Sequence, residues 1–422
     1  MYGLPISPGA IPRLASVGRS LGPGSISVLL DDPEQLIALE NFAALSGGVV
    51  PHAHIKIDMG GRRAGVIPGT DRFHEVVNAA LAAHHKHFIV LSGLYSHAGH
   101  SYGGDSRVAA MKMLGEELGA MLGAADLVVA AAQVSVKSKT NGHSVNGNCT
   151  NGVNGHSTNG WHTNGQHSEN GNGLHAVHLT DDAPNGVAPL PPLVLSAGAS
   201  PTALAVQNLL AADVHLDGSN GNSNEGSELH EAAASLSALF SAIRNKSHVV
   251  EIHAGVYPTL DLQQLAAHST SSDTLSWRDM AFTVLAEVHA VYPGRGANGR
   301  AEALVGAGGL ALGRETCKAY SGMAMCSPWG RSGVELPSGE VEAFRGWMVG
   351  RFAQEHGILT WMEGETTGGQ EPDALHVGQK LRLWPNHSCI TGSHFGWYFV
   401  VDESRTGRED EIVDIWVRGR GW

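Results

Sequence analysis

The sequence predicts an α/β protein in which a parallel sheet with helical crossovers is followed by a separate all-β domain. Up to residue 275, short β-branched or apolar runs alternate with helical patterns, which is typical of strands joined by right-handed crossovers. After Ser276 the pattern changes to strands joined by Gly- and Pro-rich turns. We therefore divide the chain into residues 1–275 and 276–422.

The first part contains five runs with strand character and three stretches with helical character between them. The predicted strands are Ile26–Leu30, His54–Met59, Phe88–Ser92, Leu193–Ala197 and Val249–Ala254, and the predicted helices are Pro33–Ala44, Asp71–His84 and Arg107–Ala124. Five strand-helix units are too few for a closed barrel of eight, so either the sheet is open or units are missing at the front. In the second part the predicted strands are Phe282–Tyr292, Glu302–Leu312, Gly357–Glu363, Lys380–Trp384, Trp397–Val401 and Ile412–Arg418.

Composition and charge narrow the function classes. With 422 residues, of which 42% are hydrophobic and 16% charged, the chain can bury a sizeable core. A net charge of -13 without a basic cluster argues against nucleic-acid and anionic-membrane partners. There is no signal sequence, no run of 18 apolar residues and no CxxC pair. We expect a cytoplasmic protein that acts on a small molecule.

Two polar segments interrupt the globular pattern. Residues 138–173 carry eight Asn-Gly dipeptides, which predicts a disordered insertion because such a segment cannot pack a core. The six histidines between His143 and His178 have no fixed spacing, so we attribute them to low-complexity composition and not to a metal site. Residues 217–228 are predicted to form an expanded surface loop.

Candidate site residues follow the predicted strands, since ligand groups lie at the carboxyl ends of parallel strands. The loop after the third strand carries Tyr95 and Tyr102, which could flank a cofactor ring or bond a phosphate, or could be structural. After the fourth strand, residues 196–202 offer hydroxyls at a helix start, where a phosphate site or a simple N-cap are both consistent with the pattern.

The fifth and second predicted strands carry charged groups. Glu251 and His253 lie two residues apart, so on a strand they face the same side, which in a barrel is the inside. The second strand, with Lys56, Asp58 and Arg63 close together, is interpreted as a network of charges inside a barrel.

The sharpest motif lies in the second part, in the sequence Pro-Asn-His387-Ser-Cys389. On an extended chain these two side chains face one side, and imidazole and thiolate both suit Zn²⁺ while leaving positions open for water or substrate. The alternative is a buried cysteine beside a hydrogen-bonded histidine.

The order of the motifs IDMGGRRAGV, LYSHAGHSYGG, LSAGASPT, EIHAGVYPTLDLQQL and PNHSC resembles that of eukaryotic D-serine dehydratases. This resemblance implies an alanine-racemase-type barrel that holds pyridoxal 5'-phosphate, followed by a β domain with a pair of zinc-binding side chains. It implies zinc ligation by His387 and Cys389; the related D-threonine aldolases have His-x-Asp there, so Cys389 favours the dehydratase. The resemblance places five residues near the cofactor: Tyr95, Tyr102, Thr202, Val256 and Tyr257.

The resemblance further implies a homodimer that converts D-serine to pyruvate and ammonia, with the cofactor as electron sink and zinc polarising the β-hydroxyl. The family's Schiff-base lysine lies in a Pro-His-x-Lys-Thr-His-Lys-like motif, which this sequence does not contain. We reject Lys56 as its equivalent, because Lys56 runs into a later motif of the family. The five strands then correspond to barrel strands four to eight, and roughly 80 to 120 residues are expected to be missing upstream of Met1.

No catalytic residue is therefore assigned, and the chain by itself is expected to be inactive. The alternatives are a D-threonine aldolase-like retro-aldol lyase and a non-catalytic protein that binds pyridoxal phosphate and zinc.

Overall fold

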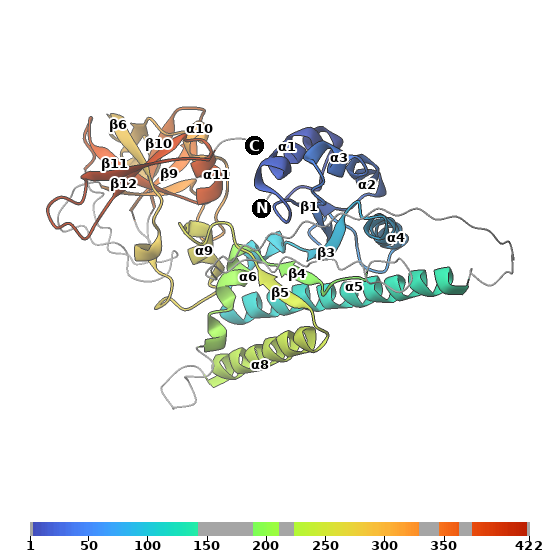
Figure 1. Ribbon diagram of the computed structural model, residues 1–422. Coiled ribbons are helices and arrows are strands. Elements are labelled where there is room, and N and C mark those ends of the chain that lie inside the picture. The colour runs from blue at the N-terminus through green and yellow to red at the C-terminus, as the bar shows by residue number, and fades with distance from the viewer. Residues whose placement is uncertain (1–2, 142–188, 211–222, 329–345, 363–373, 420–422) are drawn as a thin grey trace, which may run out of the picture.

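The computed structural model describes residues 3–141, 189–210, 223–328, 346–362 and 374–419. Its first part contains a five-stranded parallel sheet in the order β1-β2-β3-β4-β5. Its second part contains a closed antiparallel barrel in the order β10-β7-β6-β11-β8-β9 and a separate hairpin, β12-β13 (Figure 1). The predicted combination of α/β and all-β structure is confirmed. The numbering of the parallel strands as four to eight of a larger barrel remains a prediction.

The strands of the parallel sheet are β1 (Ser27–Leu30), β2 (His52–Lys56), β3 (Val90–Tyr95), β4 (Val194–Ala197) and β5 (Val249–Ile252). The helices of this part are α1 (Ile11–Leu21), α2 (Pro33–Leu39), α3 (Phe42–Ser46), α4 (Asp71–His85), α5 (Arg107–Asn141), α6 (Ser200–Ala205), α8 (Ser223–Asn245) and α9 (Leu262–Ala267). The second part contains β6 (Val284–Tyr292), β7 (Glu302–Val305), α10 (Gly309–Leu312), β8 (Ala324–Pro328), β9 (Gly346–Phe352), β10 (Gly357–Met362), β11 (Lys380–Pro385), α11 (Ser388–Ser393), β12 (Trp397–Val401) and β13 (Ile412–Val417).

Side-chain caps explain where two of the helices begin. Asp32 accepts a hydrogen bond from the Glu34 amide, and Gln35 closes a capping box by accepting from the Asp32 amide. Thr70 accepts from the Phe73 amide at the start of α4. The caps therefore define where α2 begins after β1 and where α4 begins after β2.

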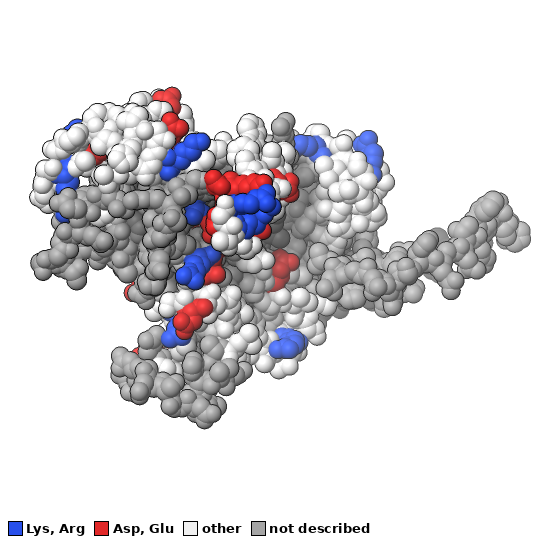
Figure 2. Space-filling view, turned by 90° about the vertical axis from the view of Figure 1, so that its left-hand side faces the viewer, with Lys and Arg blue, Asp and Glu red and all other residues white. Residues whose placement is uncertain are grey.

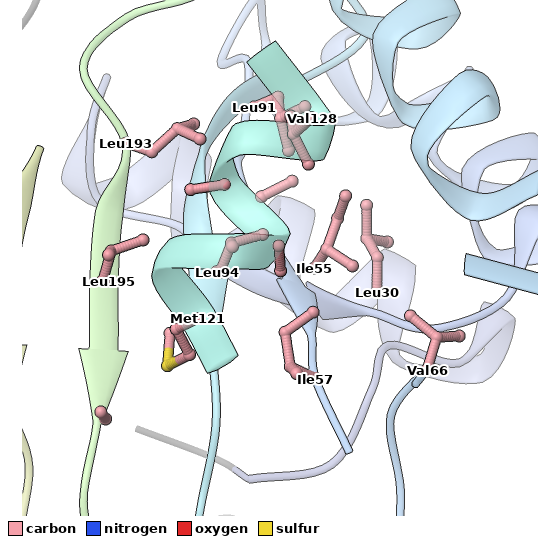
Figure 3. Close-up of a cluster of buried hydrophobic side chains, with 14 of the residues drawn as sticks. Leu30, Ile55, Ile57, Val66, Leu91, Leu94, Met121, Val128, Leu193 and Leu195 are labelled. Carbon is pink, nitrogen blue, oxygen red and sulfur yellow. The ribbon is translucent and has the colours of Figure 1, made fainter. Parts of the chain in front are cut away.

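The core of the first part lies between the sheet and α5. Leu94, Leu195 and Ile55 point from the strands toward Met121 and Val128 of this helix (Figure 3), and all five side chains are fully buried. Residues 107–134 of α5 are long and apolar enough to cross a membrane by length and composition alone. Their packing against the sheet is the pattern of a core helix in a globular domain.

A third apolar cluster joins the two parts. Trp277 precedes the β barrel and its ring lies 4.9 Å from that of Trp384, which belongs to β11. Leu262 and Leu265 of α9 belong to the same cluster, so the helix after β5 packs directly against the second part (Figure 1). The face of the molecule in Figure 2 shows basic and acidic side chains intermixed among the described residues.

Several predicted boundaries are wrong. The stretch Glu302–Leu312 is not one strand but β7 followed by α10, because a Cβ at Gly308 would lie 2.5 Å from the Gln354 carbonyl oxygen and the glycines there permit a tight turn. Strands β8 and β9 and helix α1 were not predicted. In β9, Gly350 suggests a turn, yet a Cβ there would lie 2.1 Å from the Thr360 hydroxyl, so glycine is what permits this pairing.

The two polar segments fall mainly outside the described residues. Residues 138–141 form the end of α5, contrary to the prediction, and residues 142–173 lie outside the described part. Of the predicted loop 217–228, residues 223–228 belong to α8 and the others are not described.

Candidate active site

The parallel sheet has one apolar and one polar face. Side chains alternate along a strand, so Ile55 and Leu94 point to the helices while Lys56 and Tyr95 point to the opposite face. Lys56 Nζ lies 4.8 Å from the centre of the Tyr95 ring and donates to the Gly3 carbonyl over 2.6 Å. Of the predicted network of charges, Lys56 lies on this polar face, whereas Asp58 follows β2 and accepts from the Gly60 and Arg62 amides.

The ends of β4 and β5 meet on the same face. The Ser196 hydroxyl donates to Glu251 Oε1 over 2.6 Å and lies 3.1 Å from His253 Nδ1. The prediction that Glu251 and His253 face the same side is thus confirmed. The His253 ring stacks on Tyr95 at 4.5 Å and 5° between ring planes, and His253 Nε2 is buried without a hydrogen-bond partner among the described residues.

Burial keeps the imidazoles of this face neutral. It lowers the pKa of His54, His97 and His253 to about 4 each, because the charged form is poorly solvated inside the protein. Burial also lowers the pKa of Lys56, and the nearby Arg63 lowers it further. His97 Nδ1 lies 3.0 Å from the Gly198 carbonyl and must donate to it, which leaves Nε2 as an acceptor.

The predicted cofactor residues are not all equally placed. Tyr95 is buried on the polar face, whereas Tyr257 is 60% exposed. The Thr202 hydroxyl accepts from the Ala199 amide over 2.9 Å, so it serves as a helix cap, which was the alternative interpretation of this segment. Val256 is buried and its amide donates to the Ser200 hydroxyl over 3.1 Å.

His387 and Cys389 lie at a helix start and not on an extended strand, contrary to the prediction. Strand β11 ends at Pro385, His387 is the N-cap of α11, and Cys389 occupies the first turn. The geometric argument that both side chains face one side of a strand is therefore wrong. Both residues nevertheless lie near Tyr102, which stacks on His387 and whose pKa is raised in part by Cys389.

Tyr102 links the sheet to the predicted metal pair. Its ring stacks on His387 with 5.7 Å between centroids, and burial raises its pKa to about 12, with a further rise from the nearby Cys389. On the other side, Cys389 Sγ lies 3.8 Å from where a Cβ of Gly255 would stand, in the loop after β5. The loops after β3 and β5 therefore meet His387 and Cys389 in one site.

The segment from Asn386 to Ser388 is held by the N-terminal turn of α9. Asp261 accepts from the Ser388 amide over 2.9 Å, the Thr259 and Ser388 hydroxyls lie 2.8 Å apart, and the Gln263 side chain contacts His387 Nδ1 at 2.7 Å. Burial raises the pKa of Asp261 to about 7. Sequence reasoning missed this turn, although an aspartate before the apolar run of α9 is an N-cap signal.

Two side chains of this site, those of His387 and Cys389, have donor atoms of the kind that zinc prefers. Within the described ranges, no group of three or more His, Cys, Asp and Glu side chains gathers closely enough to hold a metal ion. Burial lowers the pKa of His387 and raises that of Cys389. The imidazole of His387 stacks on Tyr102 and the Cys389 thiol lies near enough to raise the Tyr102 pKa, and one nitrogen and one sulfur donor suit a zinc ion that keeps open coordination positions.

Comparison with known families matches both parts of the chain. Residues 17–137 match the alanine racemase N-terminal domain, and residues 281–401 match the putative serine dehydratase domain. D-threo-3-hydroxyaspartate dehydratase from Delftia sp. has a similar fold, with a TM-score of 0.59 and 22% identity over 100% of this chain and 79% of that one. The fold of this chain, a parallel α/β sheet followed by a β domain, is therefore similar to that of alanine-racemase-like proteins.

Sequence comparison identifies the relatives more closely. The D-serine dehydratase of Schizosaccharomyces pombe is 29% identical over 100% of this chain and 73% of its own length. That of Saccharomyces cerevisiae is 26% identical over 100% of this chain and 74% of its own length. The chain is a homologue of the fungal D-serine dehydratases, and this homology places it among the dehydratase-type lyases.

Proposed function

We propose that this protein is a D-serine dehydratase that uses pyridoxal phosphate and zinc. The observation that carries the proposal is the stacking of Tyr102 on His387, at 5.7 Å between ring centroids. This contact joins a loop at the carboxyl ends of the parallel strands, where such folds bind cofactors, to a pair of side chains that suit zinc. A cofactor bound at the sheet and a metal bound at the β domain would then both contact the same substrate molecule.

The polar face of the sheet fits a flat, charged cofactor. Tyr95 offers an aromatic surface already stacked on His253, and the buried His253 Nε2 has a lone pair or proton to pair with a ligand. When bound, pyridoxal phosphate supplies an electron sink for carbanion chemistry at the α-carbon of an amino acid. The neutral imidazoles of His97 and His253 each keep a nitrogen lone pair that can accept a hydrogen bond or a proton, which an imidazolium lacks.

The side chains of His387 and Cys389 suit a metal ion that acts as a Lewis acid. His387 and Cys389 supply one nitrogen and one sulfur, the donor types that zinc prefers, and leave positions for a substrate hydroxyl. A metal there would make hydroxide a better leaving group at neutral pH. Binding would also release the proton of the Cys389 thiol, whose pKa is raised in the metal-free protein.

The anchoring lysine decides whether this sequence turns over substrate. No Pro-His-x-Lys-Thr-His-Lys-like motif occurs in it, and Lys56, which lies over Tyr95, donates to the Gly3 carbonyl. We therefore propose that the 422-residue chain alone does not release pyruvate from D-serine, whereas a version extended with the lysine-bearing strand of the family does.

The test is pyruvate release from D-serine, with pyridoxal phosphate and zinc added, by both versions. Turnover by the 422-residue chain that is abolished by Lys56→Ala would show that Lys56 is the anchoring lysine and that our strand assignment is wrong. Production of glycine and acetaldehyde from D-threonine, without pyruvate from D-serine, would favour the retro-aldol alternative. Absence of either activity from the extended version, with both cofactors bound, would favour a binding protein.

A further inference from the structure

The side chain of Gln263 forms a bridge between the sheet part and the β domain. Gln263 lies in the first turn of α9, and its Nε2 donates to the Thr316 carbonyl over 2.7 Å. Its Oε1 lies 2.7 Å from His387 Nδ1. The backbone amide of Gln263 also donates to the Asn386 carbonyl over 3.2 Å. The residue therefore contacts the β domain through both main chain and side chain.

These contacts determine which way the amide points. A carbonyl oxygen can only accept, so the group facing Thr316 is the NH₂ group and the group facing the imidazole is the oxygen. Because Gln263 Oε1 can only accept, His387 Nδ1 must carry the proton of this hydrogen bond. In a neutral imidazole, the proton on Nδ1 leaves the lone pair on Nε2.

The orientation of the ring is fixed from two further sides. Tyr102 stacks on the His387 ring with 26° between the ring planes. The backbone on either side of His387 is held as well, since the Asn386 side chain donates to the Glu315 and Gly322 carbonyls and the Ser388 amide donates to Asp261. The imidazole is thus restrained in both rotation and tautomer without any metal ion.

We propose that Gln263 is a positioning residue that holds His387 in the Nδ1-H tautomer and so presents Nε2 to the metal ion. This inference rests on the proposed zinc site. A hydrogen-bond acceptor behind a metal-binding histidine orients the ring and raises the basicity of the ligating nitrogen, and its loss costs about 10- to 100-fold in metal affinity.

Two substitutions separate positioning from simple domain attachment. Gln263→Leu keeps a similar volume but removes both side-chain hydrogen bonds. Gln263→Glu keeps an acceptor for His387 Nδ1-H and loses only the donor to Thr316. Gln379→Leu is the matched control, because the Gln379 side chain accepts from the His376 amide in a turn of the β domain before β11.

Zinc affinity is measured by competition with a chromogenic chelator, on the full chain without pyridoxal phosphate. We expect the dissociation constant of Gln263→Leu to rise about 10- to 100-fold, that of Gln263→Glu to stay near the parent value, and that of Gln379→Leu to be unchanged. Equal losses in the Leu and Glu variants would show that the bridge only attaches the domains, and would overturn the proposal. No loss in Gln263→Leu would overturn it as well.

The tautomer of His387 provides a readout that needs neither metal nor a variant at Gln263. Proton-nitrogen correlation spectra of the metal-free chain with ¹⁵N-histidine, assigned by the signal lost in His387→Gln, should show the proton on Nδ1. A proton on Nε2 would overturn the proposal even if zinc binds. A parent chain with the Nδ1-H tautomer but without zinc affinity would instead refute the proposed metal site.

Discussion

Gly198 offers a sharp test of how tightly the site is built. It follows β4 with a φ of 133°, and a Cβ added there would lie 2.5 Å from the His253 carbonyl oxygen. A side chain in this backbone conformation costs about 1–3 kcal/mol in strain, and forcing the loop away from a backbone atom costs about another 1–3 kcal/mol. We therefore expect Gly198→Ala to lower the free energy of unfolding by about 2–6 kcal/mol.

The measurement is urea-induced unfolding followed by far-UV circular dichroism, with Gly119→Ala as the control. Gly119 lies within α5, where an added Cβ meets nothing within 4 Å, so this variant should be about 0.5–1 kcal/mol more stable than the parent. Because the Gly198 carbonyl accepts from His97, Gly198→Ala should also weaken binding of pyridoxal phosphate. A Gly198→Ala variant as stable as the parent would refute the packing described between the loops after β4 and β5.

Three further predictions follow from the structure and the sequence. Leu94→Ala, at a fully buried side chain between β3 and α5, should cost about 2–5 kcal/mol, whereas Ile37→Ala at a 66% exposed side chain should cost less than about 0.5 kcal/mol; similar losses for both would be inconsistent with this core. Stability should fall as the pH decreases from about 6.5 to about 4, because His54, His97 and His253 have pKa values of about 4 when folded and about 6.5 when unfolded, so the unfolded chain binds more protons there. The urea midpoint at pH 7 and pH 5 measures this, and His54→Gln should reduce the difference; a midpoint that rises toward pH 5 would contradict the burial of these rings. Deletion of residues 142–173 should change stability by less than about 1 kcal/mol, since repeated Asn-Gly gives nothing to bury, and a large loss of folded protein would contradict that.

The sequence predicted the parallel sheet well because its strands are short apolar runs between helical patterns. Each of the five strands begins within two residues of its predicted first residue, and α4 begins at Asp71, as predicted. Prediction was weaker in the β barrel, where Gly350 in β9 suggests a turn and the glycines after β7 hide a short helix. There, the close approach of two backbones decides the structure, and such contacts between distant segments are invisible in local periodicity.

The candidate site, too, could be predicted from the sequence only in part. The face shared by Glu251 and His253 follows from strand alternation alone, and the structure confirms it through Ser196. The arrangement of His387 and Cys389 could not be inferred from a strand pattern, because α11 begins between them. Gln263 lies 124 positions from His387 in sequence, and no local pattern connects the two.

The zinc content of the purified 422-residue chain tests the central claim most directly. The account predicts about one zinc per chain, bound by His387 and Cys389, with most of it lost in Cys389→Ala. Cys149→Ala, outside the His-x-Cys motif, is the control and should keep its zinc. Metal analysis by mass spectrometry after removal of loosely bound ions gives the answer. A zinc content unchanged by Cys389→Ala would contradict the proposed site, and with it the proposed D-serine dehydratase chemistry.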